Sequence, residues 1–131
     1  MDTHPRKSVP EGARQHVTAG PYSPVIEVDA RRLVVLSGQV AVAPDGSVIG
    51  DTIEAQTKAT LENCRRQLAV AGCGFGDVFK VNVYLSDLAE WARFNAVYEA
   101  TFPRPLPVRT AVQAILMPGF RVEIEMWAVK P

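Results

Sequence analysis

The chain has 131 residues, with 14 basic and 14 acidic side chains and a formal net charge of zero. A chain of this length forms one domain, and a balanced charge gives no electrostatic footprint for nucleic acid or an anionic membrane surface. No apolar run approaches the ~20 residues that cross a bilayer, and the polar first residues do not resemble a secretion signal. We therefore expect a cytoplasmic protein without a nucleic-acid or membrane partner.

The cysteines and histidines exclude several kinds of site. Cys64 and Cys73 have neither the spacing of a CxxC pair nor that of a metal cluster. Both histidines, His4 and His16, lie in the polar N-terminal segment, so the folded body has no Ser-His-Asp arrangement and no histidine-bound zinc. Phosphate-binding glycine motifs are also missing. We expect no metal and no cofactor, so any chemistry must use arginine, carboxylates, hydroxyls, backbone and water.

The first half of the chain predicts an extension followed by strands. Residues 1–19 are polar without a period and predict a flexible N-terminal extension, which leaves residues 20–131 as the single domain. Strands are predicted at residues 25–28 and 33–42, and a further short strand near residues 48–49. The proline and glycine of Pro44-Asp45-Gly46-Ser47 predict the turn before that last strand.

Two helices are predicted, each with one apolar face. Asp51 is expected to cap the first helix, with Glu54 as its partner in a capping box, and Asp87 with Glu90 open the second in the same way. Glycines end the first helix and prolines end the second. The apolar stripes consist of Ile53, Thr57, Leu61, Cys64, Leu68 and Ala71 in the first helix and of Leu88, Trp91, Asn95, Tyr98 and Phe102 in the second.

Three more strands are predicted at residues 78–85, 108–116 and 121–128, and the last two are expected to form a hairpin about residues 117–120. The order βββαβαββ predicts an α+β fold, with both helices packed side by side on one face of a single sheet. The other sheet face is expected to mix polar and large apolar groups, which favours a homo-oligomer. Its expected members are Arg109, Gln113, Glu123, Ile115, Trp127 and Val129.

Arg109 is informative because it lies in an otherwise apolar strand. A guanidinium keeps its proton, so where it is partly buried it must be paired. Its own strand offers no carboxylate, so the partner is remote in the chain or is a bound anion. An arginine and a glutamate on adjoining strands, such as Arg109 and Glu123, can bind a small carboxylic acid and act on it. The alternative is an inter-subunit salt bridge, for example with Glu125.

The expected hairpin also predicts how far apart Arg109 and Glu123 lie. Glu123 would pair near Ile115, and six residues of strand span roughly 20 Å. A three- or four-carbon acid cannot bridge that distance. The two residues would therefore act on one substrate only if the second came from a neighbouring subunit.

Five short motifs together resemble the RidA/YjgF/UK114 family of reactive-intermediate deaminases, also described as endoribonuclease L-PSP-like. The likeness runs from about residue 16 to the C-terminus. It implies a chorismate-mutase-like fold, a homotrimer with ligand sites between subunits, and hydrolysis of small 2-imino or enamine acids, such as 2-aminoacrylate and 2-iminobutyrate, to 2-keto acids and ammonia without metal or cofactor. The motifs are Gly20-Pro21-Tyr22-Ser23, Leu36-Ser37-Gly38-Gln39-Val40, Phe94-Asn95-Ala96-Val97-Tyr98, Pro107-Val108-Arg109 and Val122-Glu123-Ile124-Glu125.

The resemblance also implies roles for individual residues. Arg109 matches the arginine that binds the substrate carboxylate, and Glu123 matches the glutamate that positions the attacking water. The other matches are the pocket-lining, substrate-binding residues Tyr22, Ser37 and Gly38, and Asn95, which corresponds to a structural asparagine behind the pocket.

The sequence departs from the family pattern at three places. Thr110-Ala111 stands where many members have Ser-Cys, Pro24 replaces a common glutamine, and Ile115-Leu116 lacks a basic residue often found there. The changes at Pro24 and Ile115 bear on pocket shape and leave open a deaminase for another substrate, such as an aminomuconate-like intermediate. A second alternative is a non-catalytic trimeric protein that binds small carboxylates through the same arginine. A ribonuclease is disfavoured by the neutral charge and the missing histidines.

Overall fold

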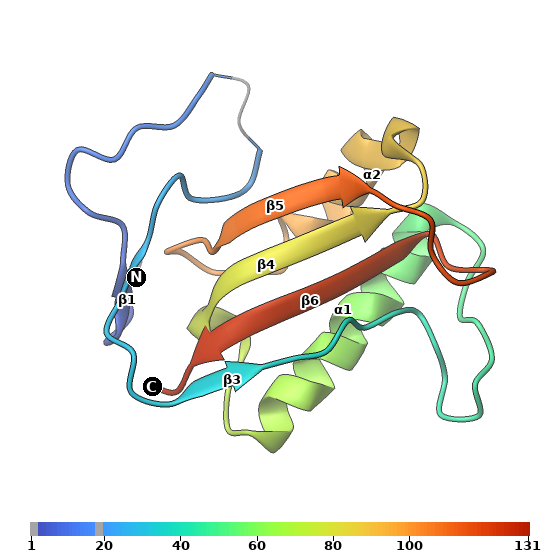
Figure 1. Ribbon diagram of the computed structural model, residues 1–131, viewed down its shortest axis with the longest axis horizontal. Helices are drawn as coiled ribbons and strands as arrows, with labels where there is room; N and C mark the ends of the chain where they lie inside the picture. The colour runs from blue at the N-terminus through green and yellow to red at the C-terminus, as the bar shows by residue number, and fades with distance from the viewer. Residues whose placement is uncertain (1–2, 18–19) are drawn as a thin grey trace.

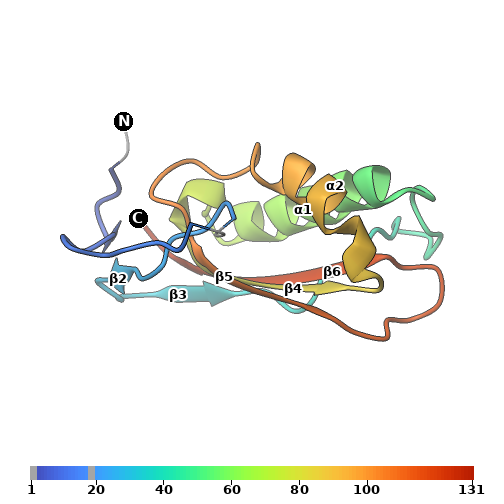
Figure 2. The ribbon, with the colours of Figure 1, turned by 90° about the horizontal axis from the view of Figure 1, so that it is seen from above.

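The computed structural model describes residues 3–17 and 20–131. Two helices, α1 (Ile53–Val70) and α2 (Trp91–Tyr98), lie against one face of a four-stranded sheet (Figures 1 and 2). The predicted α+β class, with both helices on the same side of the sheet, is confirmed.

The strand order of this sheet is β3 (Leu33–Val35), β6 (Val122–Val129), β4 (Val78–Leu85) and β5 (Val108–Gln113). β4 runs parallel to β5 and antiparallel to β6. The predicted hairpin between the last two strands is therefore wrong, because β4 lies between them. β4, α2 and β5 form a parallel crossover unit, and β5 ends earlier than predicted, so residues 114–121 form a loop that crosses the end of β4 (Figure 1).

The strand predicted at residues 33–42 is shorter than expected. β3 ends at Val35, although the backbone N–H of Leu36 still donates to Met126 O at 3.0 Å and Gln39 forms an isolated bridge with Ile124. The strand predicted near residue 48 is a single bridge between Val42 and Val48. This irregular continuation of β3 places residues 36–39 beside the start of β6.

The described part of the N-terminal segment lies against the domain. β1 (Lys7–Ser8) pairs antiparallel with β2 (Glu27–Val28) in a separate two-stranded sheet. Lys7 is buried, and its Nζ donates to the carbonyls of Val78 and Pro105. Residues 1–2 and 18–19 of the predicted flexible extension lie outside the described residues.

Both helix starts differ from the prediction by short distances. The N-cap of α1 is Thr52, not Asp51, and its Oγ1 accepts from the N–H of Ala55 at 3.1 Å. Both residue types cap well, so the sequence does not separate two adjacent candidates. Asp87 does cap, but it caps a short 3₁₀ helix, η2 (Leu88–Glu90), and α2 follows it. The other 3₁₀ helix, η1 (Phe75–Asp77), leads into β4.

One hydrophobic core fills the space between the helices and the sheet. Cys64 lies in it as expected, and burial raises the pKa of its thiol to about 12. Phe94, absent from the predicted stripe of the second helix, is fully buried, whereas Leu88 is exposed. Other buried members are Ile53, Leu61, Leu68, Val81, Val83, Leu85, Tyr98, Ile124 and Met126.

The face of the sheet without helices carries exposed apolar side chains from three strands, namely Leu33, Val35, Trp127 and Val112. Its predicted membership needs correction. Gln113 lies on the helix side, where its Oε1 accepts from the N–H of Leu88.

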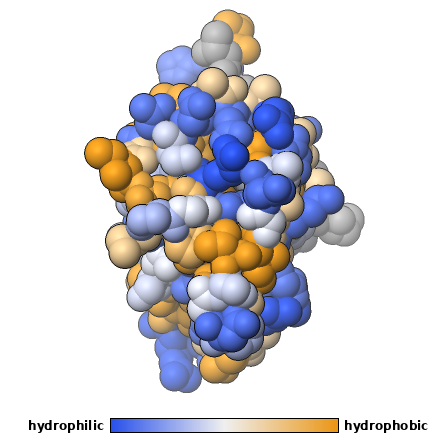
Figure 3. Space-filling view, turned by 90° about the vertical axis from the view of Figure 1, so that its right-hand side faces the viewer, coloured by the Kyte–Doolittle hydropathy of each residue, from blue (hydrophilic) through white to orange (hydrophobic). Residues whose placement is uncertain are grey.

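One further member of the predicted outer face, Ile115, lies elsewhere: it is in the loop after β5, where Ile115 and Met117 are both exposed. Figure 3 shows that end of the molecule, where apolar surface gathers. Val129 alternates with Ala128 and pairs with Leu33, so it lies on the helix-free face as predicted, but it is buried. Among the described residues, no helix is long and apolar enough to cross a membrane.

Candidate active site

Arg109 lies under α2, on the helix side of edge strand β5. Its backbone neighbour across the ladder is Val81, whose side chain belongs to the core. The prediction that Arg109 occupies the helix-free face is therefore wrong. The predicted alternation of side chains along the strand is confirmed. The apolar side chains that alternate with Arg109, such as Val108 and Val112, face away from the helices, and Val112 is exposed.

Four aromatic rings surround the guanidinium. Its Cζ lies 4.7 Å from the ring centre of Tyr98, 5.2 Å from those of Trp91 and Tyr22, and 5.9 Å from that of Phe94. Ring faces attract a cation and exclude water, so the charge is held without an ionic partner.

Among the residues that the structure describes, a single hydrogen bond fixes the guanidinium of Arg109. Nη1 of Arg109 donates to Oδ1 of Asn95 at 2.7 Å. Nη2 is buried and has no partner, and no ion pair among the described residues includes Arg109. Burial lowers the pKa of Arg109, although a guanidinium stays charged at any ordinary pH. A desolvated cation with an unpartnered donor is an attractive position for an anion.

The loop of residues 20–23 closes over this cation. The backbone N–H of Ser23 donates to Pro107 O at 3.1 Å, and its Oγ donates to Leu106 O. These bonds attach the loop to the start of β5 and bring the ring of Tyr22 to Arg109. A Cβ at Gly20 would lie only 3.2 Å from Nη2, so glycine is the residue that leaves room there.

Glu123 lies on the opposite face of the sheet. It stands across from Tyr84 in the β4–β6 ladder, and it is half-buried. Gly38 is beside it: a Cβ at that position would lie 2.1 Å from Oε2 of Glu123. The bridge between Gln39 and Ile124 causes this close approach, and Ser37 is exposed next to it. Gly38 and Glu123 thus lie in close approach, with Ser37 next to Gly38 in the chain.

Glu125, the alternative partner considered for Arg109, is engaged elsewhere within the chain. Its Oε1 accepts from the hydroxyl of Tyr84 at 2.5 Å, and this hydrogen bond raises the pKa of Tyr84. It also lies on the helix-free face, so within one chain it does not approach Arg109.

The six predicted site residues therefore fall into two groups. Arg109, Tyr22 and Asn95 form the arginine cluster under α2, and Glu123, Gly38 and Ser37 form the glutamate cluster on the helix-free face. Strands β5 and β6 are two strand spacings apart, about 10 Å, and the side chains point to opposite faces. The two clusters of one chain do not meet.

Sequence reasoning missed how α2 contributes to the arginine cluster. Trp91, Asn95 and Tyr98 share one stripe of the helix, as predicted. Asn95 was expected behind the pocket, but Trp91 and Tyr98 were interpreted as core packing only. The polar Asn95 within that apolar stripe was the available signal that a polar group lies opposite. Apart from its place in the motif Gly20-Pro21-Tyr22-Ser23, nothing in the sequence indicated that Gly20 lies beside Arg109.

A metal centre has no support among residues 3–17 and 20–131. No group of three or more histidine, cysteine, aspartate or glutamate side chains is placed to hold a metal ion there. The chemistry of the two clusters is that of a guanidinium, a carboxylate and hydroxyl groups.

Comparison with known proteins identifies the family. The family model described as endoribonuclease L-PSP matches residues 13–130. The chain belongs to this family. Its relatives include proteins named reactive intermediate deaminase, so this is the RidA/YjgF family that the motifs resemble.

Three relatives show how far the similarity extends. The chain is 36% identical over 126 residues to the protein mmf2, mitochondrial, of Schizosaccharomyces pombe, covering 93% of this chain and 98% of that protein. It is 38% identical over 113 residues to the 2-iminobutanoate/2-iminopropanoate deaminase of Mus musculus, covering 85% and 82%. The crystal structure of the YjgF gene product from E. coli superposes with a TM-score of 0.70 at 33% identity, covering 79% of this chain and 85% of that one.

Proposed function

We propose that this RidA-family protein hydrolyses small reactive 2-imino and enamine acids, such as 2-aminoacrylate and 2-iminobutyrate, to 2-keto acids and ammonia. The observation that carries the proposal is the buried Arg109, whose Nη2 has no partner and whose charge has no counter-ion among the described residues. The deaminase names of the mouse protein and of a Salmonella typhimurium relative at 36% identity support the reaction class.

Arg109 supplies the binding half of the reaction. A guanidinium matches a carboxylate in shape and donates two parallel, charge-assisted hydrogen bonds. Asn95 holds Nη1, and the rings of Tyr22 and Tyr98 fix the plane of the group. Fixing the carboxylate converts a random encounter into an oriented one, which is the largest rate contribution available to so simple a site.

Glu123 supplies the proton transfer. An imine is already electrophilic at C2. A water held there by the Glu123 carboxylate adds to C2, and the proton it loses passes through Glu123 to the nitrogen, which gives a carbinolamine. The proton of the carbinolamine hydroxyl then passes to the nitrogen by the same carboxylate, the C=O bond forms, and ammonia leaves as the C–N bond breaks. General acid–base help of this kind contributes typically ~10²–10⁴-fold.

The two clusters act on one substrate when they come from different copies of the chain. We propose a homotrimer, with the arginine cluster of one subunit facing the glutamate cluster of the next. The exposed apolar side chains of Leu33, Val35 and Trp127 on the helix-free face are of the kind that an oligomer covers. They share that face with Glu123.

Replacement of Arg109 tests the proposal. With freshly generated 2-aminoacrylate, Arg109→Ala should reduce kcat/KM for keto-acid release by at least ~100-fold, because two charge-assisted hydrogen bonds worth ~1.5–3 kcal/mol each are lost. Arg109→Lys should recover only part of this, since an ammonium cannot donate the parallel pair. Arg93→Ala is the matched control, because that arginine is exposed and pairs with Glu54.

The outcome also separates the alternatives. Wild-type rates in Arg109→Ala would overturn the assignment. Tight binding of 2-oxobutanoate to the wild type without any rate enhancement would identify a carboxylate-binding protein instead. Acceleration confined to larger imino acids, made in situ by amino-acid oxidases, would identify a deaminase for another substrate.

A further inference from the structure

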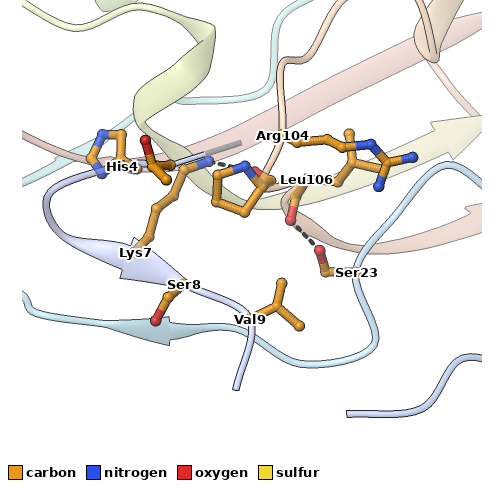
Figure 4. Close-up of a pocket in the computed structure, with 9 residues that line it drawn as sticks. His4, Lys7, Ser8, Val9, Ser23, Arg104 and Leu106 are labelled. Carbon is orange, nitrogen blue, oxygen red and sulfur yellow. Dashed lines mark hydrogen bonds between the residues drawn. The ribbon is translucent and has the colours of Figure 1, made fainter. Parts of the chain in front are cut away.

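A second buried cation lies at the other end of β5, in the N-terminal segment. Lys7 is only 3% exposed, and its Nζ donates to Val78 O at 2.6 Å and to Pro105 O at 2.9 Å. An ammonium has three N–H donors, so one remains after these two bonds. Figure 4 shows the side chain extending from β1 toward the loop that carries Arg104 and Leu106.

Lys7 has no carboxylate partner among the described residues. The charge of Asp77 acts on Lys7, but one oxygen of Asp77 bonds to Nε2 of His4 at 2.7 Å and the other accepts from the N–H of Gly74 at 2.8 Å. Neither Lys7 nor Arg104 takes part in an ion pair within the described part of the chain.

A cavity of about 360 Å³ opens beside these groups. All of its ionisable lining residues are basic, namely Lys7, Arg104 and His4, and no acidic residue lines it. Val9 and Leu106 give it apolar walls, and hydroxyl-bearing residues complete the lining. Its size is that of a pocket for a small molecule.

We propose that this cavity binds a small organic carboxylate, with Lys7 and Arg104 as its cationic groups. The proposal does not depend on the imine chemistry, because the site shares no residue with the arginine cluster. The uncompensated charges favour an anion, and the apolar walls favour an organic one over inorganic phosphate. Ser23, whose Oγ bonds to Leu106 O, follows Tyr22 in the chain and so links this cavity to the loop over Arg109.

Nuclear magnetic resonance titration with succinate tests the site. In the full-length protein, succinate should shift the amide resonances of Val9 and Leu106, whereas neutral succinamide should not. The same shifts should persist in Arg109→Ala, which removes the other carboxylate site. Equal shifts with succinamide, or their loss in Arg109→Ala, would overturn the proposal whether or not the protein proves to be a deaminase.

Two variants identify the cations. Arg104→Gln should weaken succinate binding about tenfold, because one charge-assisted contact is lost, while imine hydrolysis stays unchanged. Lys7→Met should abolish the binding, with a melting curve as the check on folding. If Lys7→Met does not fold, Arg104→Gln decides, since Arg104 is exposed. Wild-type affinity in Arg104→Gln would contradict the proposal.

The pH dependence gives an independent readout. Burial lowers the pKa of Lys7 to about 8, against the opposing effect of Asp77. Because the anion binds the protonated amine, affinity should fall as the pH rises through this value, by about tenfold per pH unit. The other titratable or charged groups near Lys7 are His4 on its own segment, Asp77 of η1 and Arg104. Affinity that is constant between about pH 7.5 and 10 would exclude Lys7 as the binding group.

Discussion

The arginine cluster and the glutamate cluster are built in opposite ways. Arg109 is enclosed by the loop of residues 20–23, by α2 and by its own strand, and nearly all of its surface is covered. Glu123 is half-buried on a sheet face without helices, with Gly38 as its close neighbour. The proposed carboxylate-binding half is thus preorganised within one chain, whereas the proposed proton-transfer half needs a second chain to enclose it.

Removing the carboxylate of Glu123 should separate catalysis from binding. Glu123→Gln keeps the shape and removes the proton acceptor, so kcat for imino acids should fall by ~10²–10⁴-fold. Affinity for 2-oxobutanoate should stay within about threefold, because Arg109 is untouched. Steady-state kinetics and calorimetry measure the two quantities. Equal losses in kcat and in affinity would show that binding and proton transfer are not separated between the two clusters.

Adding a carboxylate beside Arg109 should damage binding instead. Asn95→Asp is isosteric and places a negative charge 2.7 Å from Nη1, so the protein itself supplies the anion that the substrate should provide. We expect KM to rise roughly 10–100-fold, with little change in melting temperature. An unchanged KM would mean that the substrate carboxylate does not use this guanidinium.

A methyl group at Gly38 should give the smallest effect. The added Cβ would lie 2.1 Å from Oε2 of Glu123, so the flexible carboxylate must turn to another rotamer. Gly38→Ala should lower kcat about three- to tenfold and leave KM nearly unchanged. A matched substitution, Gly74→Ala, tests general stability, because an added Cβ there would meet no atom within 4 Å and the φ of Gly74 is negative. A larger rise in KM than loss of kcat would place Gly38 in contact with the substrate.

The sequence predicted the helices and strands themselves better than it predicted which strands pair. Helix stripes and strand alternation follow from local periodicity, so α1, α2 and the alternation around Arg109 were recognised. The pairing of β5 with β4 depends on a crossover that periodicity does not record, so the face of Arg109 was assigned wrongly. The same limit applies to Lys7, since a single lysine in a polar segment gives no indication that it will be buried.

The sequence motifs identified the residues of the candidate site, whereas the fold showed which of these residues lie together. Five motifs brought Arg109, Glu123 and Gly38 forward as candidates, but only the strand order shows that Arg109 and Glu123 face opposite sides of the sheet. The prediction of a site between subunits remains, now for a different reason. The sequence argument separated Arg109 and Glu123 by distance along a hairpin. In the structure they are separated by strand order and by the opposite directions of their side chains.

Subunit mixing tests the central claim most directly. Arg109→Ala and Glu123→Gln subunits, each inactive alone, are unfolded together and refolded as mixed oligomers. If each site takes Arg109 from one subunit and Glu123 from the next, about a quarter of the sites in a random equal mixture carry both groups. We therefore predict recovery of about a quarter of wild-type activity. Mixed oligomers that form but stay as inactive as the two parents would contradict a site shared between subunits.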